Sequence, residues 1–173
     1  MNKVGVYSHG QLNDLNLNAK FDLIYISDSD SWLYDYKQVK KLAIKRNLLW
    51  VVADDIDDLW LLKSGVKNNW TVINAKQLNL IRQFIKRSLL TKYPLIVSCT
   101  AGISRSAAVG WYSAQQTSNT VLCDFITHYQ NKILPNVCWY LLLNKYKLTQ
   151  DNWNKINNQR YSVFNLERVN NNE

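Results

Sequence analysis

The sequence is poor in cysteine, proline and glycine, and each shortage excludes a class of structure. Three cysteines occur among 173 residues, Cys99, Cys123 and Cys138, and no two of them have the spacing of a zinc-binding pair. A disulfide framework and a metal centre are therefore not expected, and no cofactor is predicted. Two prolines and five glycines are too few for a flexible linker between domains. The apolar runs are much shorter than the roughly 18 residues of a membrane-spanning helix.

The chain is basic, but its positive charge is not concentrated in one block. The formal net charge is +8, and no run of Lys and Arg is longer than two residues. Scattered pairs of this kind are typical of solvated helix faces rather than of a nucleic-acid patch. The first residues show neither the apolar stretch nor the cleavage site of a secretory signal. The sequence therefore predicts a protein of a reducing compartment, the cytoplasm.

The order of the apolar segments predicts an α/β domain. Strands are expected at residues 3–7, 21–26, 48–53 and 95–98; the second and third appear buried on both faces, and the second should be central. Helices are expected at residues 34–47, 75–92, 107–116, 119–132 and 135–147, with Asn74 as an N-cap and Pro135 in a first turn. This alternation predicts a central, mostly parallel sheet flanked by helices.

We expect one main domain over residues 1–148. Residues 149–173 form a polar, Asn-rich extension that packs on the same domain. Residues 59–73 mix aromatic residues with turn-forming ones and are interpreted as a loop. Its Trp60 and Trp70 are equally compatible with lining a cleft and with packing. Cys123 and Cys138 lie on apolar helical faces and are interpreted as inert core residues.

Cys99 stands where a strand passes through a tight loop into a helix. Such a loop gathers backbone N–H groups at a helix N-terminus and binds a tetrahedral oxyanion, of which phosphate is the natural example. The same field lowers the pKa of a thiol from about 8.5 to roughly 3.5–7.5, so we expect a nucleophilic thiolate at the mouth of the loop. Arg105 can hold two phosphoryl oxygens, and Gly102 permits unusual backbone angles. Ser106 can donate a hydrogen bond to the sulfur.

The segment SCTAGISRSAA, residues 98–108, resembles the signature loop of the cysteine-dependent protein tyrosine phosphatases, especially the dual-specificity branch. A weaker resemblance to small bacterial and viral members extends over residues 20–147. It implies a phosphotyrosine protein phosphatase-like fold and hydrolysis of phosphorylated protein, on tyrosine and also on serine or threonine, through a phosphocysteine intermediate. By position, Cys99 would be the nucleophile and Ser106 the partner of its sulfur. The phosphate cradle would be Thr100, Ala101, Gly102, Ile103, Ser104 and Arg105.

Two features depart from the family pattern. Ser98 occupies the position that usually holds histidine, so one contribution to thiolate stability is weaker or is supplied differently. The tryptophan-proline-aspartate lid of the classical tyrosine-specific enzymes is also missing, which implies a shallower site. RNA 5′-triphosphates and phosphoinositides therefore remain alternative substrates within the same chemistry. A phosphate-binding interaction module with little or no turnover is the alternative from another class.

A general acid must protonate the leaving oxygen, and one aspartate can then act as base toward water. The resemblance places this residue after the strand at residues 48–53 and favours Asp55, because small members often have Asp-Ile there. Asp54, Asp57 and Asp58 remain alternatives, and each of the four could instead cap a solvated turn. Since Asp55 is farther from Cys99 in sequence than the family usually shows, residues 59–73 would be an insertion over the site.

Three further polar residues are given structural roles. Asp28 and Asp30 follow another parallel strand and so lie at the same edge of the sheet, but loop capping is the favoured interpretation. Asn136 follows Pro135 at a helix start, which is sufficient to explain it.

Overall fold

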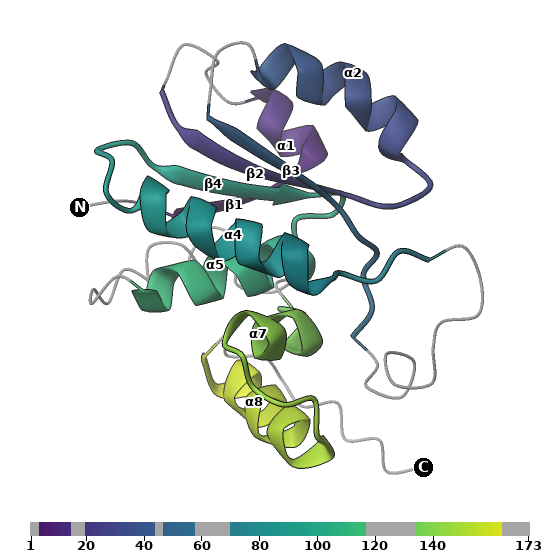
Figure 1. The fold of residues 1–173 in the computed structure, drawn as a ribbon, viewed down its shortest axis with the longest axis vertical. Coiled ribbons are helices and arrows are strands. Elements are labelled where there is room, and N and C mark those ends of the chain that lie inside the picture. The colour runs from purple at the N-terminus through teal and green to yellow at the C-terminus, as the bar shows by residue number, and fades with distance from the viewer. Residues whose placement is uncertain (1–3, 15–19, 44–46, 58–69, 117–133, 164–173) are drawn as a thin grey trace.

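Within residues 4–14, 20–43, 47–57, 70–116 and 134–163, the computed structural model describes four strands and six helices (Figure 1). In chain order they are β1 (Val4–Ser8), α1 (His9–Asp14), β2 (Asp22–Ser27), α2 (Trp32–Ala43), β3 (Leu48–Val52), α4 (Ala75–Ser88), β4 (Leu95–Cys99), α5 (Arg105–Gln116), α7 (Val137–Leu143) and α8 (Gln150–Val163). The expected helix at residues 119–132, most of the loop at residues 59–73, Trp60, Asp58 and Cys123 lie outside the described residues.

The four strands form one parallel sheet in the order β1-β4-β2-β3. The predicted α/β architecture with a parallel sheet flanked by helices is thus confirmed. The central position of β2 is also confirmed, because it pairs with β4 and β3 and all six of its residues are buried. The expectation that the third strand is buried on both faces is wrong: β3 lies at the edge, and only Val51 is fully buried.

Helices cover both faces of the sheet. Side chains alternate along β2, so Leu23 and Tyr25 pack with α1 and α2, whereas Ile24 and Ile26 face the larger core built with α4, α5 and α7. Figure 1 shows α1 and α2 on one side of the sheet and α4 and α5 on the other. The site described below lies where β2, β3 and β4 all end, at one edge of these layers.

The predicted start of the helix at residues 75–92, which is α4, is confirmed, but its predicted end is not. Asn74 caps α4, with its side chain accepting from the Gln77 backbone while the Gln77 side chain accepts from the Asn74 backbone. The helix ends at Ser88 rather than at residue 92, because the backbone N–H groups of Leu90 and Thr91 turn back to Arg87 and Ser88.

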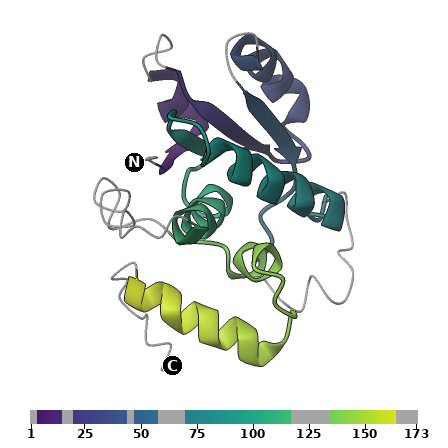
Figure 2. The same cartoon turned by 60° about the vertical axis from the view of Figure 1, so that its left-hand side comes forward.

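The structure corrects the prediction for the C-terminal third at two points. Asn136 is the N-cap of α7, so Pro135 precedes the helix instead of standing in its first turn. Residues 150–163 form α8, where the sequence suggested only a polar extension. The sequence did not predict this helix because, among the described side chains, the face of α8 that packs on the domain contains only two apolar residues, Trp153 and Ile156, and then a buried arginine, Arg160. The helix packs against α7 on the side away from the sheet (Figure 2).

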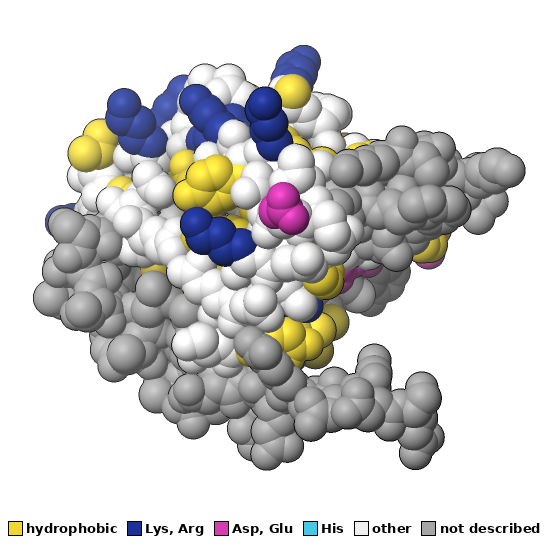
Figure 3. All heavy atoms as spheres, turned by 90° about the horizontal axis from the view of Figure 1, so that it is seen from below, with side chains coloured by type: hydrophobic (Ala, Val, Ile, Leu, Met, Phe, Trp, Pro, Cys, Tyr) yellow, Lys and Arg dark blue, Asp and Glu magenta, His cyan; other side chains and the backbone are white. Residues whose placement is uncertain are grey.

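Two of the basic pairs noted in the sequence lie on helix faces, as expected. Lys40 and Lys41 lie in the last turn of α2, Lys86 and Arg87 lie in the last turn of α4, and all four are exposed. Cations are favourable there because a helix carries partial negative charge at its C-terminus. On the face drawn in Figure 3, several Lys and Arg side chains lie along the upper edge and another lies near the middle, while uncharged side chains cover much of the described surface. None of the helices in the described ranges combines the length and hydropathy that a bilayer crossing requires.

Candidate active site

The loop between β4 and α5 is held in a compact shape by Gly102. Its φ angle is 72°, in the left-handed region that favours glycine. A Cβ atom at this position would lie 2.5 Å from the Ser8 nitrogen and 2.8 Å from the Tyr7 carbonyl carbon, both backbone atoms at the end of β1. The backbone N–H of His9 also donates to the Thr100 carbonyl at 3.4 Å. The unusual backbone angle predicted for Gly102 is confirmed, and close packing against β1 is a second reason for glycine.

The backbone of the loop leaves its donors available for an anion. Besides the Thr100 carbonyl, two further loop carbonyls are engaged: Ile103 accepts from Leu134 at 3.1 Å, and Ser104 accepts from Ala108 at 2.9 Å and Asn136 at 3.2 Å. The N–H groups of residues 101–104, in contrast, make no hydrogen bond anywhere in the described structure. Free N–H groups just before the N-terminus of α5 suit a tetrahedral oxyanion.

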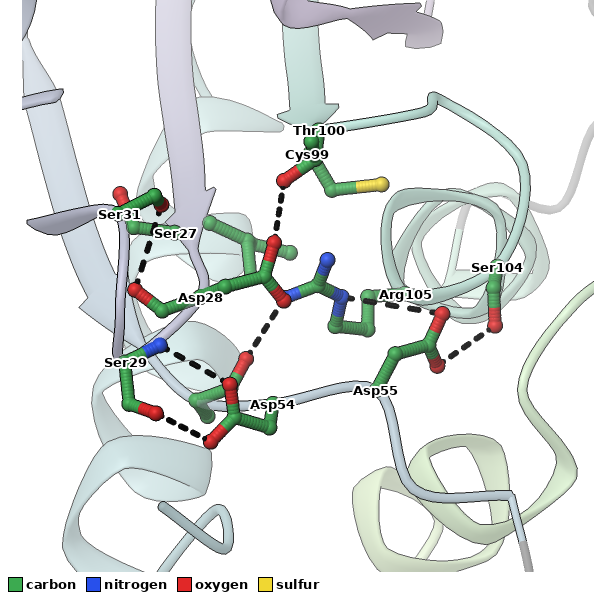
Figure 4. A network of polar contacts seen from close by, with 12 residues as sticks. Ser27, Asp28, Ser29, Ser31, Asp54, Asp55, Cys99, Thr100, Ser104 and Arg105 are labelled. Carbon is green, nitrogen blue, oxygen red and sulfur yellow. Dashed lines mark hydrogen bonds and ion pairs between the residues drawn. The ribbon is translucent and has the colours of Figure 1, made fainter. Parts of the chain in front are cut away.

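Cys99 ends β4 and lies inside the loop rather than at its mouth. The residue is only 1% exposed, which corrects the expectation of an accessible sulfur. Its Sγ atom lies 3.0 Å from the Ser106 Oγ atom, so the expected sulfur–hydroxyl contact is present. Figure 4 shows the sulfur pointing toward the start of α5.

Arg105, the first residue of α5, brings a buried positive charge to the site. Its side chain is 4% exposed, and Nη1 donates to the Ala53 carbonyl at 2.8 Å and pairs with Asp28 Oδ1 at 2.6 Å. Nε has no hydrogen-bond partner among the described residues and lies 3.9 Å from Asp55 Oδ2. Burial alone would lower the pKa of Arg105, but the hydrogen bond and charge of Asp28 outweigh it, so the pKa is raised. The guanidinium is charged and keeps donor capacity for an oxyanion.

Asp28 belongs to this site, which the sequence interpretation missed. Its carboxylate pairs with Arg105 through Oδ1 and accepts from the Thr100 hydroxyl through Oδ2 at 2.5 Å, so it joins the end of β2 to both ends of the loop. The favoured capping role is therefore wrong for this side chain, whereas Asp30 lies exposed in the following turn. The strand order explains why Asp28 lies here: β2 pairs directly with β4, with Ile26 opposite Cys99, so the residues that follow these two strands are neighbours.

Asp54 and Asp57 bind neighbouring segments instead of the loop between β4 and α5. Asp54 accepts from the Ser29 backbone and hydroxyl at 2.9 and 2.7 Å and from the Thr71 backbone at 2.5 Å. Burial would raise its pKa, but these hydrogen bonds outweigh it and the pKa of Asp54 is lowered. Asp57 accepts from the Val137 backbone at 2.7 Å, and burial raises its pKa. Both carboxylates have complete structural explanations.

Asp55 is the described member of the acidic cluster that lies at the loop. Its Oδ1 accepts from the Ser104 hydroxyl at 2.8 Å and from Asn136 Nδ2 at 2.7 Å. Its side chain is 35% exposed, and Arg105 lies between it and Asp28 (Figure 4). Asn136 has the expected capping role, since its Oδ1 accepts from the Trp139 backbone, but its amide also orients Asp55. This second contact joins α7 to the site and was not foreseen.

The remaining residues singled out in the sequence lie apart from this network. The Ser98 hydroxyl is fully buried and has no hydrogen-bond partner within the described ranges, so it does not replace the polar contacts of a histidine. Cys138 is buried in α7, and Trp70 is 49% exposed. Among the described residues, no group of three His, Cys, Asp or Glu side chains is placed as metal ligands would be.

No protein-family model matches the chain, and no curated protein matches it. A similar solved structure is the crystal structure of human tyrosine phosphatase-like serine/threonine/tyrosine-interacting protein. The TM-score is 0.48 at 20% sequence identity, and the superposition covers 80% of this chain and 83% of that chain. This likeness concerns the fold and assigns neither a family nor an activity, so the site is interpreted from its own geometry.

Proposed function

We propose that the chain hydrolyses phosphate monoesters through a covalent phosphocysteine intermediate. One observation carries the proposal: the Cys99 sulfur, 3.0 Å from the Ser106 hydroxyl, begins a loop of free N–H groups that the charged Arg105 completes. This combination offers a nucleophile and fixed positive potential to the same phosphoryl group. The dual-specificity resemblance makes a protein phosphorylated on tyrosine, and also on serine or threonine, the substrate that we favour.

The first step transfers the phosphoryl group to sulfur. The Cys99 thiolate attacks phosphorus in line with the ester oxygen, so an S–P bond forms as the P–O bond to the leaving group breaks. The loop N–H groups and Arg105 stabilise charge on the equatorial oxygens. Asp55, in its protonated form, gives its proton to the departing oxygen, which leaves as an alcohol or phenol.

The second step releases inorganic phosphate. Asp55, now a carboxylate, takes a proton from a water molecule that attacks phosphorus, and the S–P bond breaks. The sulfur leaves as a thiolate, and the Ser106 hydroxyl donates a hydrogen bond to it. Asp55 is thereby protonated again and Cys99 regenerated, so the cycle is balanced.

The nucleophile is tested with Cys99→Ser and a matched control, Cys138→Ala, which removes another buried thiol away from the loop. Hydrolysis of p-nitrophenyl phosphate should be abolished in the first variant, while binding of inorganic phosphate, measured by calorimetry, is retained. The control should keep its turnover. Undiminished turnover by Cys99→Ser would refute the mechanism.

Asp55 is tested through the leaving group. Asp55→Asn should slow phenyl phosphate hydrolysis by about 100-fold or more, because general acid catalysis contributes roughly 10²–10⁴-fold when the leaving oxygen needs a proton. It should slow 2,4-dinitrophenyl phosphate much less, because dinitrophenolate departs without one. Equal losses for both substrates would exclude Asp55 as the acid.

A phosphate-binding module without turnover is the second candidate. It is favoured by the unpartnered Ser98 hydroxyl at the usual histidine position and by the close pairing of Arg105 with Asp28. A wild-type rate at background, together with tight binding of phosphopeptides, would support this function instead. The substrate panel should contain phosphotyrosine and phosphoserine peptides, 5′-triphosphorylated RNA and phosphoinositide headgroups, which separates the alternatives within the phosphatase chemistry.

A further inference from the structure

Arg160 of α8 reaches from the C-terminal helix to the loop that carries Asp55. The residue is 5% exposed, and its Nη1 atom donates to Asp57 Oδ2 and to the Pro135 carbonyl, both at 2.8 Å. Its sequence distance from Asp57 is 103 residues, so this contact exists only in the folded chain. A buried arginine with two acceptors joins three segments: α8, the residues before α7 and the loop after β3.

Asp57 continues this connection into α7. Its Oδ1 accepts from the backbone N–H groups of Val137 at 2.7 Å and Cys138 at 3.3 Å, the first two residues of that helix. One carboxylate thus receives the start of α7 on one oxygen and Arg160 on the other. The loop after β3 and the start of α7 are held together by this group.

Two of the supports of Asp55, its own backbone and the Asn136 amide, come from the same two segments. Asp55 stands two residues before Asp57, and Asn136, which donates to Asp55 at 2.7 Å, directly follows Pro135. The Asp55 side chain is 35% exposed, and its distance to the Arg105 Nε atom is 3.9 Å, so no tight ion pair holds it. Its direction depends on its own backbone, on the Ser104 hydroxyl at 2.8 Å and on the Asn136 amide. Arg160 fixes the neighbours of two of these three supports, the Asp55 backbone and Asn136.

We propose that Arg160 is a positioning residue that orients Asp55 through Asp57 and the Pro135 carbonyl, and that α8 is therefore a functional part of the site. Arg160 touches neither substrate nor sulfur. The inference rests on the proposed function, because it assumes that Asp55 is the general acid. A displacement of about 1 Å in a catalytic group can cost about 100-fold in rate.

The test compares Arg160→Met with Arg82→Met. Arg82 provides a matched control, because its side chain donates to the Leu143 carbonyl at 3.0 Å and the Leu142 carbonyl at 2.8 Å, at the opposite end of α7. Each variant is assayed on phenyl phosphate and on 2,4-dinitrophenyl phosphate, with thermal unfolding measured in parallel. Arg160→Met should slow phenyl phosphate hydrolysis by about 10–100-fold and dinitrophenyl phosphate hydrolysis only slightly. Arg82→Met should leave the ratio of the two rates unchanged, even where it lowers the melting temperature.

Two further variants keep the test decisive. In an Asp55→Asn background, Arg160→Met should cause little additional loss, because the group that it positions is already absent. Arg160→Lys, which retains the charge, should restore part of the leaving-group effect. If Arg160→Met fails to fold, Asp57→Asn removes the same ion pair while keeping an oxygen for α7, and it should give the same change in the ratio of rates.

The outcomes separate this inference from the proposed function. Equal losses on both substrates for Arg160→Met, or a full additional loss in the Asp55→Asn background, would overturn the positioning role while leaving the phosphatase mechanism intact. Full turnover by Cys99→Ser would instead refute the proposed function itself. The absence of any leaving-group effect in Asp55→Asn would exclude Asp55 as the general acid, and with it the positioning role of Arg160, while leaving the phosphocysteine chemistry intact.

Discussion

Replacing Gly102 with alanine should destabilise the fold and weaken anion binding together. The left-handed backbone at φ 72° costs an L-residue roughly 1–2 kcal/mol. The new Cβ atom would also lie 2.5 Å from the Ser8 nitrogen, a backbone atom of a strand that pairs with β4, so it cannot be relieved by a side-chain rotation. Forcing an extra carbon into a packed site costs about 1–3 kcal/mol. The two contributions predict a loss of roughly 2–5 kcal/mol, a large share of the 5–15 kcal/mol typical of a domain.

The assay is urea unfolding combined with calorimetric titration of inorganic phosphate. Gly10→Ala is the control: it lies in α1, the nearest atom to its Cβ would be the Ser8 Oγ atom at 3.8 Å, and alanine there should stabilise the chain by at most about 1 kcal/mol. Phosphate affinity should fall in the Gly102 variant, because the loop must move away from β1 and its N–H groups move with it. Unchanged unfolding free energy and unchanged phosphate affinity in Gly102→Ala would refute the described loop conformation.

Two other predictions concern charged groups beside the loop. Asp28→Asn should tighten phosphate binding, because the carboxylate 2.6 Å from Arg105 no longer competes with the anion. It should also lower the unfolding free energy by about 1–3 kcal/mol, because Arg105 loses a charged partner. Weaker phosphate binding in calorimetry would contradict this prediction. Burial lowers the pKa of His9 in the folded chain from its ordinary value of 6.5. As the pH falls through 6.5, His9 therefore takes up a proton more readily in the unfolded chain than in the folded one, and the free energy of unfolding decreases. The melting temperature should therefore decline from about pH 7.5 to about pH 5.5 more steeply in the wild type than in His9→Gln, and equal slopes would exclude this role for His9.

The loop between β4 and α5 could be predicted from sequence because its residues are neighbours in the chain. Cys99, Gly102, Arg105 and Ser106 lie within eight consecutive residues, and a strand, tight turn and helix start place them in one loop. The end of β1 and the residues before α7 then contact this loop in the folded chain. The capping role of Asn74 was predictable for the same reason, because its partner is three residues away. The parallel sheet was also predictable, because strands and helices alternate and the middle of β2, residues 23–26, is continuously apolar.

Long-range contacts decided which carboxylates belong to the loop. The resemblance favoured Asp55 in a short cluster of four acidic residues but left the other three as alternatives. The fold directs Asp54 toward Ser29 and Asp57 toward α7, and it places Asp55 beside Ser104. Asp28 joined the site because β2 and β4 are neighbours, a consequence of strand order that no local pattern encodes.

The sequence by itself thus determined the order of strand, tight loop and helix around Cys99 and the parallel α/β architecture, since both follow from the chemistry and spacing of neighbouring residues. Only the tertiary structure placed β3 at the edge, made α8 a helix and connected Arg160 to the segment that carries Asp55. The physical reason is that a buried charge is stable only beside its partner, and the partner of Arg160 is brought to it by the packing of α8 on α7.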